Sequence, residues 1–284
     1  MPWSGRRRRR RRRSDPAAVP AFVLAVAVAA LTLVPVIYVV LGGFTSTAQL
    51  AEDPVGMPDP WMTGNYGSVL SSARFWRQLG NSLLIALLAT GLVVAVGSLA
   101  AFAVSRYVFR GRELVYTVFT LGLLFPVGVA ILPLYLMLRE LHLLDNPLGV
   151  AVPQAAFSIP VTIVVLRPFM AAVPNELEDA AAIDGCSGFA FFWRILLPLS
   201  RPALTTVSVL AFVTSWNAYL LPLLVLNDEQ QHTLPLGTAM FSTQYTQDTA
   251  RVLAFTALSM VPALVFFVLA ERRIVGGLTG AVKG

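Results

Sequence analysis

Six long apolar stretches, separated by short polar segments, dominate the chain. They cover about residues 17–43, 79–104, 114–138, 148–166, 203–226 and 252–270. A transmembrane helix needs about 20 mostly apolar residues, and each stretch has about that length or more. None of the six contains an Asp, Glu, Lys, Arg or His. The pattern predicts an all-α integral membrane protein with six transmembrane helices.

Composition agrees with this interpretation and narrows the function. The chain is 56% hydrophobic and only 13% charged, a balance that soluble domains rarely have. Secondary transporters usually keep ionisable groups within the bilayer, and intramembrane enzymes need catalytic groups at that depth. The charge-free stretches therefore disfavour both classes. Prolines within or beside the stretches indicate either bent helices around a pathway or a merely kinked bundle.

The basic residues are distributed unevenly between the polar segments. With the N-terminus in the cytoplasm, the inside segments hold most of the 21 Lys and Arg residues, whereas the outside loops are richer in acids. Such a bias sets the orientation of membrane proteins. The sequence predicts a multi-pass protein of the bacterial plasma membrane with both termini in the cytoplasm.

Eight consecutive arginines, Arg6–Arg13, lie just before the first apolar stretch. Residues 1–15 are predicted to be a disordered tail, in which each arginine could add about 1 kcal/mol of attraction to anionic lipid. Because these charges lie in a tail rather than on a folded face, a topology anchor on membrane lipid is favoured over nucleic-acid binding. The apolar stretch that follows is too long for a cleaved signal peptide, which predicts an uncleaved first span.

The sequence offers little catalytic chemistry of its own. One cysteine and two isolated histidines make a metal site improbable. A phosphate-binding loop of the Gly-x-x-x-x-Gly-Lys-Ser/Thr type needs an internal lysine, and the one lysine is Lys283. We therefore expect no enzyme activity and no bound cofactor in this chain.

A polar segment, residues 172–199, separates the fourth and fifth apolar stretches. Asn175 followed by Glu178 is typical of a helix-start capping box, and acids in a first turn suit the helix dipole. Gly185 is expected to end this helix in a left-handed conformation. A second, aromatic helix is predicted over about residues 187–196, ending at Pro198.

The first of these helices presents small and acidic residues at helical spacing. Leu177, Ala180, Ala181 and Asp184 would form one flat face. Such a face suits close approach to another protein. The residues alone slightly favour an amphipathic connector that rests at the membrane surface over such a docking helix.

The segment resembles the "EAA" loop of permease subunits of bacterial ABC importers. Asp179-Ala180-Ala181, Gly185, Ile195 and Leu197-Pro198 match the anchors of that loop in register, with Asp in place of the first Glu. Stretches such as "AFAVSRYVFRGRE" and "SWNAYLLPLLVL" are similar to carbohydrate-importer permeases. The C-terminal "GGLTGAVKG" is similar to the tail of the maltose-type partner permease subunit.

The resemblance implies a six-span permease domain over residues 16–275 with a cytoplasmic coupling helix that docks on an ATPase. The docking residues implied in and after the coupling helix are Glu176, Glu178, Asp179, Ala180, Ala181, Asp184, Gly185, Ile195 and Pro198. The C-terminal tail, residues 276–284, is implied to contact the same ATPase through Gly277, Leu278, Thr279 and Lys283. The implied partners are a pair of ATP-binding subunits that use ATP and Mg, a second permease subunit and an extracytoplasmic solute-binding protein.

The solute is less well defined than the architecture. Asn217 and Tyr219 are polar groups in the apolar fifth stretch, and they would either contact a sugar or form hydrogen bonds between helices. The resemblance favours sugars. Glycerol-phosphate or a polyamine is the alternative solute, and a secondary transporter is the less favoured alternative class.

Overall fold

The structure is a computed structural model that describes residues 18–241 and 247–281, and within these residues it contains helices and no strand. The longer helices are α1 (Ala18–Gly42), α4 (Ala73–Arg106), α5 (Arg112–Gly122), α6 (Val127–Glu140), α7 (Pro147–Ala171), α11 (Arg201–Trp216) and α14 (Thr249–Ala281). The shorter ones are α2 (Thr47–Glu52), α3 (Gly64–Leu70), α8 (Asn175–Ile183), α9 (Gly188–Phe191), α10 (Leu197–Leu199), α12 (Leu220–Val225) and α13 (Leu234–Gly237). A π-helical turn (Phe192–Leu196) joins α9 to α10, and a 3₁₀ turn (Thr238–Phe241) follows α13.

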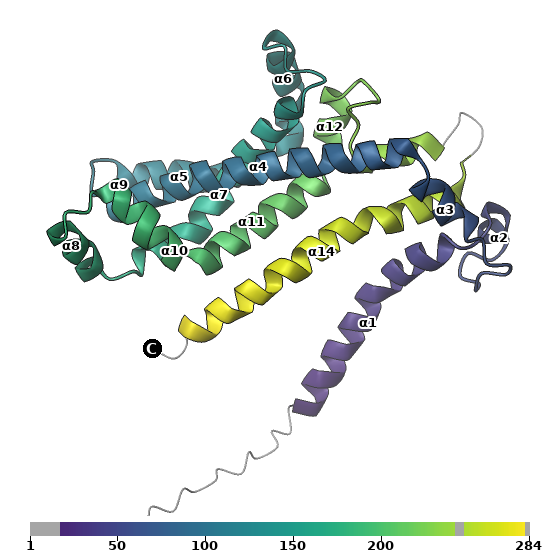
Figure 1. Cartoon of the computed structure of the whole chain (residues 1–284), viewed down its shortest axis with the longest axis horizontal. Helices are drawn as coiled ribbons and strands as arrows, with labels where there is room; N and C mark the ends of the chain where they lie inside the picture. Colours follow the sequence, from purple (N-terminus) through teal and green to yellow (C-terminus); the bar gives the residue numbers. More distant parts are fainter. Residues whose placement is uncertain (1–17, 242–246, 282–284) are drawn as a thin grey trace, which may run out of the picture.

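The centre of the fold is the close packing of α4 against α7, with α11 and α14 alongside (Figure 1). A Cβ atom at Gly97 of α4 would lie 2.5 Å from Cγ2 of Thr162 on α7, so only glycine allows this approach. Small residues commonly line helix contacts in membranes for this reason. The hydroxyl of Ser215 on α11 donates a hydrogen bond to Oε1 of Gln154 on α7, at 2.5 Å. Backbone proximity and a buried polar pair thus hold the bundle together.

Four helices are long and apolar enough to span a membrane, and up to six spans result if each of two bent helix pairs counts as one. The first pair, α5 and α6, is bent by 97°. The predicted spans 114–138 and 203–226 are therefore not single straight helices. The first is interrupted before Pro126, which caps α6 and lacks the N–H that a continuing helix needs. The second ends at Trp216 and resumes at Leu220.

The second bent pair lies where the polar segment meets α11. The helical run Gly188–Leu199 meets α11 at 80°. Pro202, within the first turn of α11, is compatible with a new helix start but not with continuation of the previous one. The bend therefore turns the polar segment away from the axis of the bundle.

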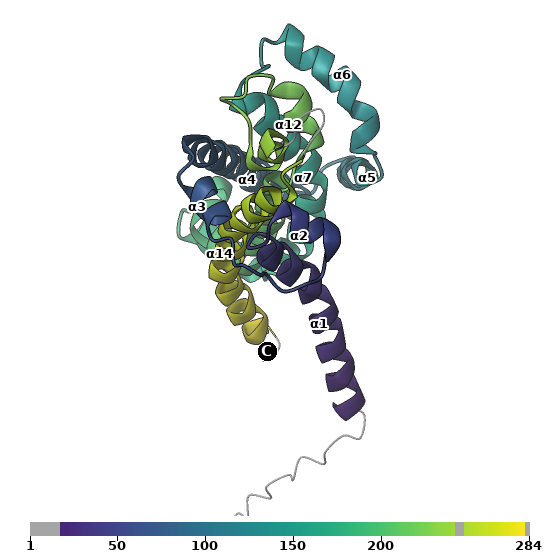
Figure 2. The ribbon, with the colours of Figure 1, turned by 90° about the vertical axis from the view of Figure 1, so that its right-hand side faces the viewer.

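Helix α1 stands apart from the other long helices (Figures 1 and 2). The most apolar stretch of α1 has no buried residue. Near its end the helix meets α14, where a Cβ at Gly42 would lie 2.5 Å from Cδ1 of Leu253. An apolar helix exposed on all sides is suited to lipid or to a partner chain.

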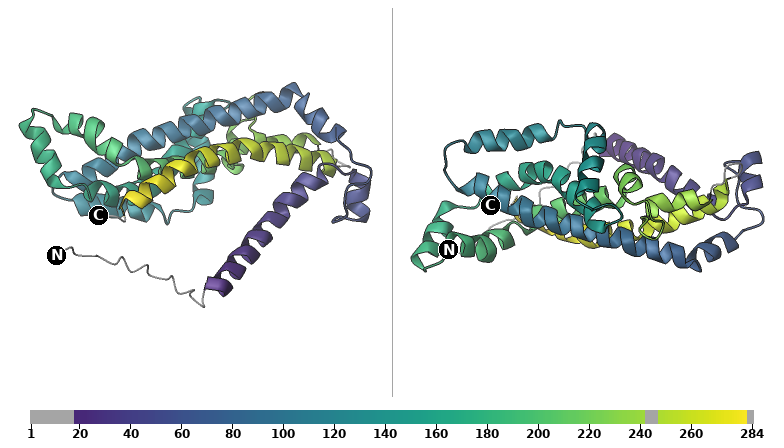
Figure 3. Two further views of the ribbon diagram at one scale, coloured as in Figure 1. Left: turned by 60° about the horizontal axis from the view of Figure 1, so that its bottom comes forward. Right: turned by 90° about the horizontal axis from the view of Figure 1, so that it is seen from above.

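The polar segment α8–α10 and the C-terminal end of α14 lie at the same end of the bundle, opposite α2 and α3 (Figures 1 and 3). Helix α14 continues to Ala281, so most of the predicted tail, residues 276–284, extends the last helix, and its Gly277, Leu278 and Thr279 are helical. The predicted N-terminal tail (residues 1–15) and Lys283 lie outside the described residues.

Candidate functional site

Helix α8 ends as the sequence predicts, at a glycine in the left-handed region. Gly185 has φ +77°, its N–H donates to the carbonyl of Ala182 at 3.0 Å, and the N–H of Cys186 donates to the carbonyl of Ala181 at 2.8 Å. These two bonds form a Schellman motif. No atom lies within 4 Å of a Cβ built at Gly185. Backbone conformation rather than space therefore requires glycine here.

The flat face predicted for α8 is divided between two environments. Leu177, Ala180 and Asp184 are exposed, whereas Ala181 is only 7% exposed and packs into the bundle. Nothing in the local spacing separates Ala180 from Ala181. Ala181 is buried because the cluster of the bundle packs against its side of α8. The surface that α8 offers to a partner therefore includes Ala180 but not Ala181.

The acids of α8 are mostly free to meet a partner. Glu176 and Asp179 are exposed on the first turns of the helix, and Glu178 is partly covered. Of the two predicted residues beyond α9, Ile195 packs against the buried cluster behind α8, and Pro198 lies within α10. The predicted docking residues thus comprise an exposed, largely acidic group on α8, the buried Ala181, and the partly buried Ile195 and Pro198.

The predicted capping box does not form. Pro174 occupies the cap position of α8, and no side chain caps the helix. Instead, Oδ1 of Asn175 accepts a hydrogen bond from Nη1 of Arg106 at 2.7 Å. A charged donor gives a stronger hydrogen bond than a neutral backbone N–H, so the amide of Asn175 serves a tertiary contact.

Arg106, the last residue of α4, is the residue that the sequence analysis missed. Its Nη2 donates to the carbonyl of Val173 at 2.6 Å, and its Nη1 lies 3.7 Å from Oε2 of Glu178. The guanidinium also stands 5.9 Å from the ring centroid of Phe191. In the sequence, an arginine at the end of an apolar stretch looks like an ordinary orientation signal. Only the fold brings it to α8.

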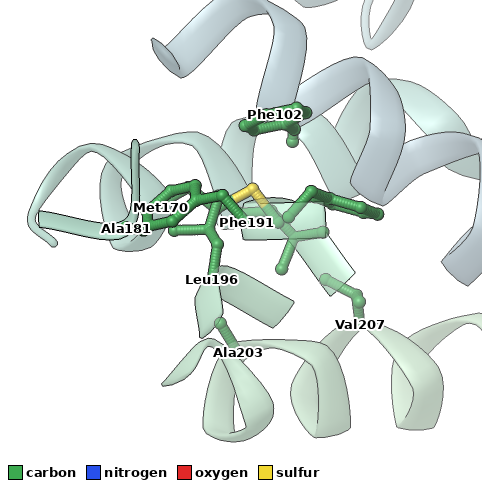
Figure 4. Packing of buried hydrophobic residues seen from close by; sticks show 10 residues of the cluster. Phe102, Met170, Ala181, Phe191, Leu196, Ala203 and Val207 are labelled. Carbon is green, nitrogen blue, oxygen red and sulfur yellow. The ribbon is translucent and has the colours of Figure 1, made fainter. Parts of the chain in front are cut away.

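A buried aromatic cluster supports α8 from behind (Figure 4). Phe102 of α4 and Phe192 of the π-helical turn have ring centroids 4.9 Å apart. Phe191, Phe192 and Leu196 are each at most 1% exposed, and Met170 of α7 and Ala181 of α8 complete the contact. Ala203 and Val207 of α11 also belong to the cluster. The cluster therefore joins the short polar segment to three of the long helices, α4, α7 and α11.

A second electrostatic contact joins α5 to α7 at this end of the bundle. Nη2 of Arg167 lies 2.6 Å from Oε1 of Glu113, and its guanidinium lies 3.9 Å from the ring centroid of Tyr116. Arg112 also contacts Glu113, at 3.0 Å. These charges fix the start of α5 against the end of α7.

A cavity of about 470 Å³ lies between α11, α13 and α14. Its polar lining consists of Asn217, Thr238, Thr256 and Ser259, and the other lining residues are mostly apolar, among them Trp216 and Phe255. No charged side chain is among these lining residues, all of which belong to the described part of the chain. The cavity is therefore suited to a neutral molecule with both polar and apolar faces.

The two predicted pathway residues lie at different places relative to this cavity. Asn217 caps the end of α11 and lines the cavity. Tyr219 occupies the N-cap position before α12, is 47% exposed and is not among the lining residues. Both occupy the break between α11 and α12 and both are exposed, but only Asn217 is among the residues that line the cavity. Nothing in the spacing of these two residues indicates this difference.

Within the described residues no group of three or more His, Cys, Asp or Glu side chains is arranged to hold a metal ion.

The comparisons with known proteins agree on a family. Residues 93–272 match the family model described as "Binding-protein-dependent transport system inner membrane component". The chain is 31% identical to a diacetylchitobiose uptake system permease protein of Streptomyces coelicolor, over 88% of this chain and 83% of that protein. It is 30% identical to an arabinooligosaccharides transport system permease protein of Halalkalibacterium halodurans, over 90% of this chain and 93% of that protein.

A solved structure has the same fold. It is a bacterial ABC transporter involved in the import of the acidic polysaccharide alginate, with a TM-score of 0.76 and 23% identity, covering 96% of this chain and 99% of that one. The chain therefore belongs to the family of inner-membrane components of binding-protein-dependent transport systems, the non-catalytic permease subunits of ABC importers.

Proposed function

We propose that the chain is the permease subunit of an importer for neutral oligosaccharides, with six spans, both termini in the cytoplasm and α8 as the helix that docks on the ATPase. Importers of this family work with a separate ATPase, a second permease and an external binding protein. ATP and Mg are bound and used by the ATPase, not by this chain.

Charge at one end of the bundle supports the proposed orientation. Arg106 ends α4, Arg112 begins α5 and Arg167 lies near the end of α7, all at the end of the bundle that carries α8. Basic residues concentrate on the cytoplasmic side of membrane proteins. The bent pair α5–α6 then counts as the third span, and α11, without the polar segment before it, belongs to the fifth.

The single observation that carries the docking proposal is the combination of exposure and attachment at α8. Glu176, Asp179 and Ala180 are exposed, while Ala181 and the aromatic cluster attach the helix to α4 and α7. A helix that transmits the movement of an ATPase needs both properties, because a loosely attached helix would move without the bundle. A connector resting at the membrane surface needs no such attachment.

The proposed cycle follows from this attachment. Closure of the two ATPase subunits on ATP displaces α8, and the aromatic cluster carries the displacement into the long helices. The spans then change from an inward-facing to an outward-facing arrangement and accept the solute from the binding protein. Gly277, Leu278, Thr279 and Lys283, at the end of the chain, are proposed to contact the same ATPase.

The relatives and the cavity both favour neutral sugars as solutes. The relatives named above take up diacetylchitobiose and arabinooligosaccharides. A polyamine would call for acidic side chains and a glycerol-phosphate for basic ones, whereas the cavity at Asn217 is lined by neutral residues. Aromatic and amide groups together are suited to sugar rings and hydroxyls.

The proposal is tested by affinity purification of the tagged chain from its native membrane in mild detergent, with mass spectrometry of the proteins that accompany it. We expect an ATPase with a phosphate-binding loop and a second, different permease. The external binding protein of that system is then screened against a panel of neutral oligosaccharides, putrescine and glycerol 3-phosphate. Recovery of the chain alone from membranes in which a control importer stays intact would overturn the proposal.

A further inference from the structure

Arg106 is a buried charge whose position is not explained by membrane orientation. An arginine that only marks the cytoplasmic side of a span keeps its guanidinium in water or among lipid headgroups. The side chain of Arg106 is 3% exposed, whereas Arg110, four residues later in the same loop, is exposed. Burying a charged side chain costs free energy unless the charge is paired. The groups that contact the guanidinium of Arg106 therefore indicate which role this residue has.

All polar contacts of this guanidinium within the described residues go to the start of α8. Nη1 donates to Oδ1 of Asn175, Nη2 donates to the carbonyl of Val173, and Nη1 faces the carboxylate of Glu178. The third nitrogen, Nε, is buried without a partner in the described part of the chain. Arg106 therefore contacts the backbone before α8, its first residue and its first turn together.

The contacts join segments that are far apart in sequence. Arg106 and Val173 are separated by 67 positions, and Arg106 and Asn175 by 69. Behind them the ring of Phe191 packs beside the guanidinium. No other ion pair within the described residues links α4 to α8.

We propose that Arg106 is a positioning residue that transmits displacement of α8 into α4. The planar guanidinium holds two acceptors at once in a fixed geometry, so α8 cannot shift without pulling on the last turn of α4. Since α4 packs along α7 and α11, movement of its end reaches the centre of the bundle. This inference rests on the proposed docking of α8, but it names a residue outside the matched EAA-type loop.

Two substitutions at Arg106 separate its roles. Arg106→Gln removes the charge and one of the two contacts, and Arg106→Lys keeps the charge but loses the two-pronged geometry. If the charge alone transmitted the displacement, Arg106→Lys would respond to nucleotide in α4 as the wild type does. Asn175→Ala removes one acceptor from the exposed start of α8 and leaves the buried arginine in place. Arg110→Gln is the matched control, since it removes an equal charge from an exposed site in the same loop.

The experiment is hydrogen–deuterium exchange with mass spectrometry on the complex of the full chain with its co-purified partners in lipid nanodiscs. Exchange is compared without nucleotide and with Mg-ATP plus orthovanadate. In the wild type and in Arg110→Gln we expect nucleotide to change exchange both in α8 and in residues 99–106 of α4. In Arg106→Gln and Arg106→Lys we expect the change in α8 to persist and the change in α4 to be strongly reduced, because only the aromatic cluster still joins the two helices. A smaller reduction is expected in Asn175→Ala.

The outcomes distinguish this inference from the proposed function. An unchanged response of α4 in Arg106→Lys, or a wild-type complex in which α4 does not respond, would overturn the role of Arg106 and leave docking of α8 intact. Failure of the ATPase to accompany the wild-type chain would overturn the proposed function itself. If Arg106→Gln does not assemble, Arg106→Lys and Asn175→Ala carry the test.

Discussion

Two regions of the molecule contrast in how their polar groups are held. At α8, exposed acids stand on a short helix that is fastened from behind by buried aromatic rings and by Arg106. At the cavity between α11, α13 and α14, a few neutral polar groups lie among apolar ones at a helix break. The first region is suited to transmit force from a partner. The second is suited to weak contact with a passing solute, which must also be released.

The largest effect is expected from removing the fastening of α8. Phe192→Ala deletes a ring that is 0% exposed and packs on Phe102, and such a deletion costs about 3–5 kcal/mol. We expect a lower thermal unfolding temperature of the purified complex and faster hydrogen exchange in α8. Trp193→Ala, at a neighbouring aromatic that is 50% exposed, is the control and should leave unfolding nearly unchanged. Equal losses in the two variants would contradict the buried cluster.

A smaller effect is expected at the end of α8. Gly185→Ala places a Cβ in a left-handed conformation, which costs about 1–2 kcal/mol, although the space around it is open. Import should fall while the chain remains in the membrane with its partners. Gly185→Asn should retain more activity, because asparagine tolerates this conformation better. A greater loss of import in Gly185→Asn than in Gly185→Ala would show that side-chain volume, not backbone conformation, limits import at this position.

The cavity is tested by comparing the two polar residues at the helix break. Asn217→Ala removes a lining amide and should weaken the apparent affinity of import by up to about tenfold, the value of one hydrogen bond. Tyr219→Phe removes a hydroxyl outside the lining and should leave the affinity unchanged. Uptake of a radiolabelled oligosaccharide, chosen from the binding-protein screen, measures both. A larger loss of apparent affinity in Tyr219→Phe than in Asn217→Ala would show that the solute does not pass through this cavity.

The smallest effect is expected from an exposed ion pair far from α8. Arg74 and Glu229 face each other with side chains 45% and 66% exposed, and such pairs contribute less than about 1 kcal/mol. Arg74→Gln should leave both thermal unfolding and import unchanged at moderate salt. Comparing Arg74→Gln with Arg106→Gln tests whether burial of the arginine side chain determines its effect on thermal unfolding and import. A marked loss on Arg74→Gln would remove that distinction.

The local parts of the site could be predicted from the sequence because their causes are local. Gly185 ends α8 through its own backbone freedom, and the acids of the first turn follow from helix electrostatics. The apolar stretches likewise mark the long helices α1, α4, α7 and α14. The prolines indicate bends, but neither they nor hydropathy show that the helices break before Pro126 and after Trp216.

The tertiary parts of the site could not be predicted from the residues nearby. Whether Ala180 or Ala181 faces a partner depends on how α8 leans on the bundle. The capping prediction for Asn175 was wrong because an arginine 69 positions away takes its side chain as a hydrogen-bond acceptor. Equally, only the packing of α13 and α14 places Asn217 at a cavity and leaves Tyr219 outside it.

The most direct test of the central claim, that α8 docks on the ATPase, is site-directed photo-crosslinking from single cysteines in a Cys186→Ser background. A thiol-reactive photo-crosslinker is attached to Ala180→Cys on α8 or to Ser71→Cys at the opposite end of the bundle, both exposed. If α8 docks on the ATPase, we expect a crosslink to the ATPase from position 180 and none from position 71. Absence of the crosslink from position 180 in an intact, ATP-hydrolysing complex would contradict this docking.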